Sequence, residues 1–343
     1  MAAQDFAVFL IGFFWVSSRF AQICPDLNFL SCGFCGLLYM IASMTVPLLF
    51  DQNLVRHHRQ RAAKKFADFA FLKDEAAIRL ADRLGLMRRD FDLCLDIGAH
   101  DGRLARHFAA LGKTAQIIQA EPAIGLAAAA QEGGPAVVHA LTDLPYAPHS
   151  FDAVFSCLSL HWVDDLPGLM VQMRHLLKPD GLLLVSVLGG NSLTELRHVL
   201  VEAEQEITGG ISPRCAPMAD IRDVGGLLGR AGLALPVADS DRLTVHYPHI
   251  FKLMEDLRGM GEQNALLARL KMPTRRAVFM RAAELYQQRF GLADGQIPAS
   301  FEIITLTGWA PHDSQQKPLR PGSAQHRLAA MLDTDEHDPD SHH

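Results

Sequence analysis

An acidic residue followed by two spaced glycines is the pattern in this 343-residue chain that is best suited to ligand chemistry. The apolar run from Leu93 ends at Asp96, and Gly98 and Gly102 precede a helix-like segment. A strand, a tight turn and a helix start form a nucleotide-like pocket at the carboxyl ends of parallel strands. Glycines in such a turn let the backbone approach a ligand closely. The spacing does not match the G-x-G-x-x-G turn of dinucleotide sites.

Two further carboxylates follow the next two predicted strands, 115–120 and 136–140. Glu121 can accept both ribose hydroxyls of an adenosyl group, as acids do at this place in other doubly wound sheets. The alternative for Glu121 is an exposed acid at a strand end. Asp143 can accept the adenine amino group while the N–H of Leu144 faces a ring nitrogen. Because Asp is common in turns, Asp143 alone is weak evidence for a ligand site. It indicates one mainly because it follows a predicted strand, as Asp96 and Glu121 do.

The fourth predicted strand, Phe151–Cys157, leads into a loop that faces the reacting end of the ligand in this topology. His161 and Trp162 in this loop are the candidates for contact with ligand or substrate. Packing under the next helix is the alternative for Trp162. Asp152 begins the strand at the opposite end, so we expect it to be structural. The pattern does not identify a catalytic residue.

Strand-like and helical segments alternate over residues 93–188, which predicts an α/β fold with a doubly wound, mostly parallel sheet. Residues 242–246 and 301–309 alternate like strands and are expected to pair as a hairpin at the sheet edge. The helical segments between them, about 250–290, are interpreted as a lid over the site. Helices in 51–90 are expected to form an N-terminal cap, with 54–66 as one basic helix and 75–86 as the next.

The first fifty residues differ from the rest in composition, because Phe29–Phe50 carries no charge. Twenty-two residues without a charge are long enough for a membrane span. Five basic residues lie between this segment and residue 66, and a basic flank of this kind is expected on the cytoplasmic side of a membrane. Membrane association through residues 29–65 is therefore one interpretation. A true start at Met44 and a cleaved targeting segment are the alternatives. The tail 326–343 is acidic and expected to be disordered.

Net charge is −6 and the isoelectric point about 6.2, so no basic field indicates a nucleic-acid partner. Cys94 and Cys157 lie in apolar strand-like runs, which indicates buried thiols in a reducing compartment rather than disulfides. We expect a cytoplasmic protein, with the inner face of the cytoplasmic membrane as its place of association. No facial triad of metal ligands stands out, so no metal site is predicted.

These motifs, with Ser159–Pro167 and Leu177–Gly181, resemble class I S-adenosylmethionine (SAM)-dependent methyltransferases over about residues 48–325. The subgroup it resembles contains malonyl-carrier-protein O-methyltransferases and mitochondrial complex I assembly factor 5, an arginine hydroxylase acting on a complex I subunit. Leu306–Pro318 looks like the assembly-factor branch. The resemblance implies a seven-stranded Rossmann-like sheet in residues 91–325 and SAM as cofactor. The SAM-binding candidates are Asp96, Gly98, Ala99, His100, Gly102, Glu121, Asp143, Leu144 and Cys157.

His100 departs from the pattern of the resembled family, because it replaces the middle glycine of the D-x-G-x-G-x-G loop. An imidazole there would stand near the methionine end of SAM. It could hydrogen-bond the SAM carboxylate, or it could narrow the pocket.

Three functions are compatible with these residues. The first is a SAM-dependent enzyme that modifies a protein, such as a complex I subunit during assembly, by methylation or, as the resemblance allows, arginine hydroxylation. The second is O-methylation of malonyl-acyl carrier protein in biotin synthesis, where Arg275, Arg276 and Arg281 could bind the free carboxylate. The third is a non-catalytic assembly chaperone that retains SAM binding.

Overall fold

A computed structural model of the chain describes residues 48–316. Residues 49–316 belong to one compact unit. The predicted span 29–50 lies outside the described residues except for its last three, and the predicted acidic tail lies outside them entirely. Within the described part of the chain, no helix has the length and apolar character needed to cross a membrane.

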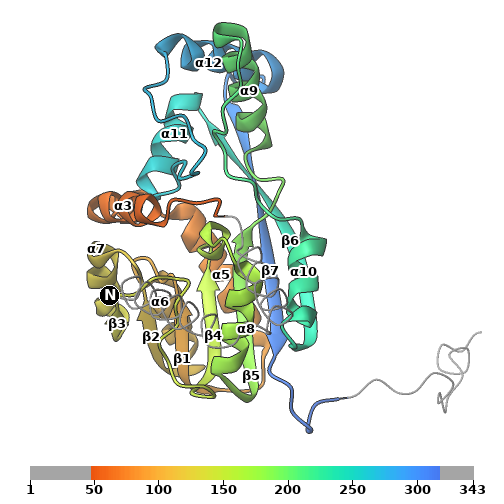
Figure 1. Cartoon of the computed structure of the whole chain (residues 1–343). Helices are drawn as coiled ribbons and strands as arrows, with labels where there is room; N and C mark the ends of the chain where they lie inside the picture. Colours follow the sequence, from red (N-terminus) through yellow and green to blue (C-terminus); the bar gives the residue numbers. More distant parts are fainter. Residues whose placement is uncertain (1–47, 317–343) are drawn as a thin grey trace, which may run out of the picture. The chain divides into compact units, whose positions relative to one another are not determined.

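A seven-stranded sheet in the order β3-β2-β1-β4-β5-β7-β6 forms the body of this unit (Figure 1). Strands β1 to β5 run parallel, and β7 is antiparallel to both β5 and β6. The predicted doubly wound, mostly parallel sheet with a hairpin-type edge is therefore confirmed. The strands are β1 (Phe91–Ile97), β2 (Thr114–Ala120), β3 (Ala136–Val137), β4 (Phe151–Cys157), β5 (Leu177–Leu188), β6 (Ala234–Tyr247) and β7 (Ile297–Trp309).

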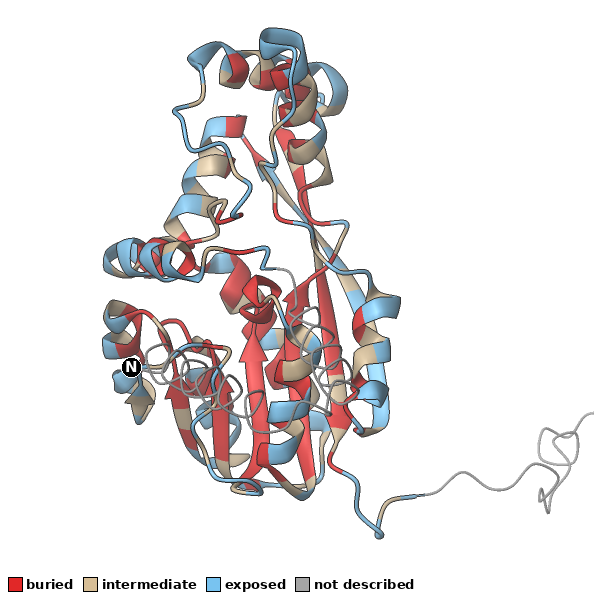
Figure 2. Ribbon diagram, viewed as in Figure 1, coloured by how far each residue is buried: buried red, intermediate tan, exposed pale blue. Residues whose placement is uncertain are grey.

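The central strands are buried on both faces, as Figure 2 shows by their red colour. Every residue of β4 is buried, and so is β5 from Gly181 onward. Continuous apolar runs of this kind are typical of parallel strands covered by helices on two sides. β6 instead alternates between partly buried and exposed residues over much of its length, as expected of a strand at the sheet edge.

Helices cover both faces of the sheet and its carboxyl end. One apolar core joins α5 and α6 to the sheet, and a second joins α8 and α10 to the other face. The helices α9, α11 and α12 lie beyond the carboxyl ends of the parallel strands (Figure 1). The helices are α3 (Gln52–Ala62), α4 (Phe66–Phe69), α5 (Phe71–Leu86), α6 (Arg103–Leu111), α7 (Ile124–Ala130), α8 (Leu166–Leu176), α9 (Thr194–Thr208), α10 (Ile221–Arg230), α11 (Ile250–Gly259) and α12 (Arg276–Phe290).

Three element boundaries differ from the sequence-based expectation. The predicted basic helix 54–66 is interrupted after α3 by a 3-10 turn, because Lys65 leaves the helical region with ψ near 14°. β3 is only two residues long, and the chain after it turns towards Asp143 without pairing. β5 begins at Leu177 because the Pro-Asp-Gly turn is absorbed as an irregularity within the strand.

Candidate cofactor and acceptor site

The loop between β1 and α6 has a left-handed backbone conformation at three positions, Gly98, His100 and Gly102. Gly98 and Gly102 have φ of +73° and +80°. A Cβ at Gly98 would lie 2.3 Å from Ser159 Oγ, and one at Gly102 would lie 2.5 Å from Gln119 Oε1. Both positions therefore require glycine, for backbone conformation and for space. The N–H groups of Gly98 and Ala99 both donate to the carbonyl of Ala120, which fixes the loop against β2.

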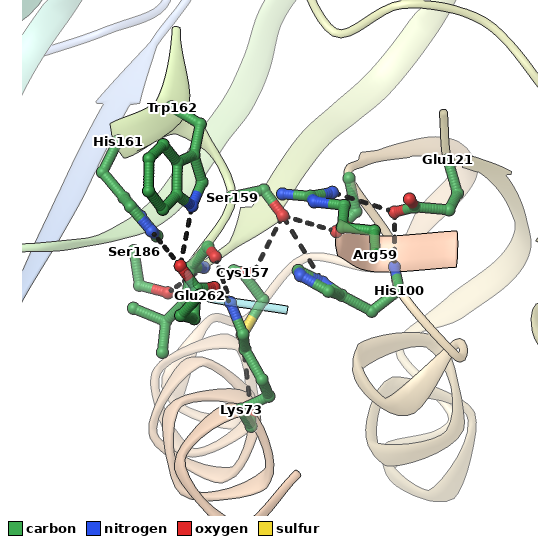
Figure 3. Close-up of polar contacts among 12 residues, drawn as sticks. Arg59, Lys73, His100, Glu121, Cys157, Ser159, His161, Trp162, Ser186 and Glu262 are labelled. Carbon is green, nitrogen blue, oxygen red and sulfur yellow. Dashed lines mark hydrogen bonds and ion pairs between the residues drawn. The ribbon is translucent and has the colours of Figure 1, made fainter. Parts of the chain in front are cut away.

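Glu121 is fully buried at the end of β2 and accepts three hydrogen bonds. The N–H of His100 donates to Oε2 at 3.0 Å, and the N–H of Ala123 donates to Oε1 at 3.1 Å. Arg59 of α3 pairs with Oε2 at 3.1 Å (Figure 3). A carboxylate offers about four lone-pair sites, so acceptor capacity remains for a ribose hydroxyl. The geometry is compatible with the role predicted for Glu121, and it excludes the alternative of an exposed acid.

Asp96 is buried at the end of β1, and neither of its carboxylate oxygens has a hydrogen-bond partner within residues 48–316. Burial, with the nearby charge of Glu121, raises the pKa of Asp96 to about 8. Buried polar atoms in native proteins nearly always have partners. An unpaired buried carboxyl group with a raised pKa, beside a glycine loop, is therefore suited to a cationic ligand group.

His100 occupies a left-handed position with φ of +53° and is also buried. Its ring stacks on Phe66 with centroids 5.5 Å apart, and Nδ1 lies 3.4 Å from Ser159 Oγ. Burial, followed by the charges of Lys73 and Arg59, holds its pKa well below the usual value, so the imidazole is neutral. Its Nε2 has no partner in the described part of the chain.

A second buried group of polar side chains lies beside this loop, and we call it the Glu262 cluster: Lys73, His161, Trp162 and Glu262 (Figure 3). Glu262 Oε1 accepts from Lys73 Nζ at 2.5 Å. Its Oε2 lies 3.0 Å from His161 Nε2 and 2.7 Å from Trp162 Nε1. Lys73 Nζ also donates to the carbonyl of Leu158 at 2.5 Å. The cluster thus connects the cap helix α5, the loop after β4 and the segment after α11.

Charge and tautomer within the Glu262 cluster follow from these contacts. Burial acts to raise the pKa of Glu262, but the charge of Lys73, the interaction with His161 and the hydrogen bonds from both together hold the pKa well below the usual range. Burial lowers the pKa of His161, so its imidazole is neutral. Because an ionised carboxylate only accepts hydrogen bonds, we assign the His161 proton to Nε2. His161 Nδ1 is then an acceptor, and it has no partner within residues 48–316.

A cavity of about 310 Å³ adjoins the Glu262 cluster, which contributes Trp162 and Glu262 to its wall. Most of the remaining lining is apolar and comes from α9, α11, α12, the segment 215–218 and the adjoining elements. Three arginines also line the cavity: Arg197, Arg214 and Arg258. Arg275, Arg276 and Arg281, which were expected to bind a free carboxylate, do not line the cavity. Arg281 instead pairs with Glu206 and Glu284 on the surface.

The remaining sequence-predicted residues occupy different environments. Asp143 is exposed and Leu144 is partly buried. The Cys157 thiol is buried, and burial raises its pKa to about 12, which keeps it protonated. Trp162 packs edge-on against Phe50, with ring centroids 5.3 Å apart, as well as bonding to Glu262. Asp152 binds Lys178 and the N–H of Leu93 at the far end of β4, so the structural role expected for it is confirmed.

Sequence reasoning missed Arg59, Lys73 and Glu262. All three lie in segments expected to be cap or lid, and Arg59 was part of a basic run interpreted as a membrane flank. In the structure the Arg59 side chain is only 2% exposed. Within residues 48–316, no group of three His, Cys, Asp or Glu side chains is arranged to hold a metal ion.

Comparison with known proteins matches residues 95–185 to the methyltransferase domain family. The mouse protein arginine-hydroxylase NDUFAF5, mitochondrial, is 42% identical over 283 residues, covering 80% of this chain and 81% of the relative. The chain belongs to the class I SAM-dependent methyltransferase superfamily. The malonyl-[acyl-carrier protein] O-methyltransferase of Gallionella capsiferriformans, another relative, is 30% identical over 275 residues, covering 77% of this chain and 92% of the relative.

Among solved structures, phosphoethanolamine N-methyltransferase 2 of Haemonchus contortus in complex with SAM matches 73% of this chain and 57% of its own, with a TM-score of 0.46 and 17% identity. The superfamily membership and the predicted resemblance to both branches are thus confirmed by the sequence relatives.

The left-handed conformation of His100 leads to a prediction for a matched pair of variants. His100→Gly and His100→Ala both remove the imidazole, but only glycine avoids the Cβ penalty at φ of +53°. We expect the glycine variant to have a free energy of unfolding about 1 kcal/mol higher than the alanine variant, measured by denaturant unfolding.

His100→Gly is also expected to keep wild-type affinity for S-adenosylhomocysteine (SAH), the demethylated form of SAM. Equal stability of the two variants would contradict the conformational argument. A large loss of SAH affinity in a folded glycine variant would show that the imidazole contacts the ligand.

Proposed function

We propose that this chain is a SAM-binding enzyme that modifies a side chain of a protein substrate, of the kind found in respiratory complex I subunits during assembly. The observation that carries the proposal is the relationship to an arginine hydroxylase, at 42% identity over four fifths of both chains. The site geometry supports it, because a glycine loop with unpaired buried polar atoms lies beside the Glu262 cluster, and that cluster lines a separate cavity.

The side chains around the glycine loop match the polar groups of SAM. Asp96 offers an unpaired carboxyl group that would hold the ammonium of the amino-acid part of SAM. Glu121 retains acceptor capacity for the ribose. Asp143, exposed beyond β3, would receive the adenine. SAM supplies a methyl group already activated by a positively charged sulfur.

The cavity would receive the acceptor side chain. Its volume of about 310 Å³ is at the small end of ligand pockets and suits one extended side chain rather than a bulky cofactor. Glu262, which lines it, is held by Lys73 and His161 and accepts a hydrogen bond from Trp162, so Glu262 and Trp162 would orient that side chain by position. Methyl transfer requires little more than such alignment. Arginine hydroxylation requires an oxidant as well, and these residues bind and orient rather than oxidise.

O-methylation of malonyl carrier protein is a second candidate, because three arginines line the cavity and could pair with a free carboxylate. Arg214 is already paired with Glu204, which leaves Arg197 and Arg258 for that role. Incubating the purified chain with SAM and malonyl carrier protein tests this candidate by intact mass. We expect no gain of a methyl group, and a stoichiometric gain would favour the second candidate over the first.

Asp143→Ala tests cofactor binding without disturbing the fold, because Asp143 is exposed. Losing one hydrogen-bonded anchor should weaken SAH binding by about 1–3 kcal/mol, or 5–150-fold, with unchanged unfolding free energy. Calorimetry measures the affinity. Glu121→Ala is a poorer test, because it also leaves Arg59 buried without its partner. Unchanged SAH affinity in Asp143→Ala would remove Asp143 from the site.

A further inference from the structure

The guanidinium of Arg59 is buried beside the glycine loop with only part of its hydrogen-bonding capacity used. Nη1 pairs with Glu121 Oε2 at 3.1 Å. Nη2 is buried and has no hydrogen-bond partner within the described residues. A buried cation with an unused donor is costly unless something else completes its hydrogen bonding. Arg59 is therefore one member of a site that a ligand would complete.

The polar atoms around Arg59 complement a zwitterion. Asp96 has two unpaired acceptor oxygens, and Arg59 has an unpaired donor nitrogen, both next to Glu121. An α-amino acid group carries an ammonium and a carboxylate, so it can pair with both without adding net charge. Two buried cations, Arg59 and Lys73, face two buried anions, Glu121 and Glu262. The amino-acid group, whose ammonium and carboxylate cancel, preserves that balance, whereas a carboxylate or an ammonium alone would not.

We propose that Arg59 recognises the carboxylate in the amino-acid part of the nucleoside cofactor, with Glu121 holding the guanidinium in place. The inference rests on the proposed function, since it assigns one more residue to the same site. It makes the cap helix α3 part of the cofactor site. A guanidinium suits the role because its fork of donors can bond two carboxylates at once, whereas the single ammonium of lysine is less able to do so.

Two ligands that differ only in the amino-acid part test the proposal. SAH carries it, and 5′-methylthioadenosine keeps the nucleoside and the sulfur but lacks it. Calorimetry on the full chain gives the affinity for each, and their ratio measures recognition of the amino-acid part. The variants are Arg59→Gln and the charge-conserving Arg59→Lys, which can still pair with Glu121 if the glutamine variant fails to fold. Arg61→Gln is the matched control, because Arg61 lies on the same helix and is exposed.

We expect Arg59→Gln to weaken SAH binding about 10–100-fold, the effect of losing a charge-assisted hydrogen bond, and Arg59→Lys to weaken it by a smaller factor. Methylthioadenosine should bind both variants within about twofold of wild type, and Arg61→Gln should change neither affinity.

Equal loss for both ligands would overturn the proposal and show that Arg59 acts only by holding Glu121. Tighter binding of both would also overturn it and show that Arg59 obstructs the ribose site. A wild-type chain that binds neither ligand would overturn the proposed function, and this inference with it.

Discussion

Replacing Glu262 with alanine is expected to lower the free energy of unfolding by about 3–5 kcal/mol, the cost of leaving a buried charge without its partner. Glu262 is the common acceptor for Lys73, His161 and Trp162, and the Lys73 side chain is only 3% exposed. Denaturant unfolding monitored by circular dichroism measures the change. Glu255→Ala is a suitable control, because Glu255 lies on the exposed face of the preceding helix and, among residues 48–316, has its one ion pair with Lys252.

Two further measurements identify the buried charge as the cause. The double variant Lys73→Met, Glu262→Leu should lose less stability than the sum of the two single variants, with a coupling of about 1–3 kcal/mol. In Glu262→Ala, burial lowers the pKa of Lys73 with no counter-charge to raise it. The unfolded state then binds more protons than the folded state. The loss of unfolding free energy in Glu262→Ala relative to the wild type should therefore shrink as pH rises towards about 9. Strict additivity, or a deficit independent of pH, would contradict the assignment.

Asp96→Asn is expected to weaken SAH binding about 30-fold or more while leaving the protein at least as stable as the wild type. Asparagine matches the shape of the neutral carboxyl group that prevails at pH 7, because burial raises the pKa of Asp96 to about 8. It cannot supply the negative charge that an ammonium needs. Binding of methylthioadenosine, which has no ammonium, should change little in this variant.

The pH dependence of the wild type provides the control for Asp96. An ammonium pairs with the ionised form, so SAH affinity should fall by up to about tenfold per pH unit as pH decreases below about 8. Between about pH 4 and 8 the folded state holds a proton that the unfolded state lacks, so wild-type stability should fall as pH rises. Asp96→Asn should show neither trend. A pH-independent wild-type affinity would contradict the ammonium role of Asp96.

The sheet could be predicted from the sequence because its signals are local. Apolar runs bounded by turn residues mark each parallel strand, and Gly98 and Gly102 stand where the backbone must take positive φ. Boundaries were less predictable where local rules conflict. The Pro-Asp-Gly turn near residue 180 predicts that no strand begins before it. Strand β5 nevertheless starts at Leu177 and continues past the turn, because it pairs with β4 and β7.

The candidate site could be predicted only in part, because half of it depends on tertiary contacts. Asp96, Glu121 and the glycines lie at strand ends, where the topology itself brings them together. Arg59 and Glu262 are 62 and 189 residues from their partners Glu121 and Lys73. On helices and loops such residues have the pattern of ordinary surface charges. Only the way that the cap and the segment after α11 pack onto the sheet turns them into buried partners.

Peptide mapping by mass spectrometry of the respiratory complex I subunits tests the central claim most directly. The subunits would be isolated from cells with the wild-type gene, with the gene deleted, and with the deletion complemented by Asp96→Asn. We expect one side chain to gain an oxygen atom or a methyl group in the wild type and to be unmodified in the other two. Identical peptides in all three strains, with normally assembled complex, would contradict it.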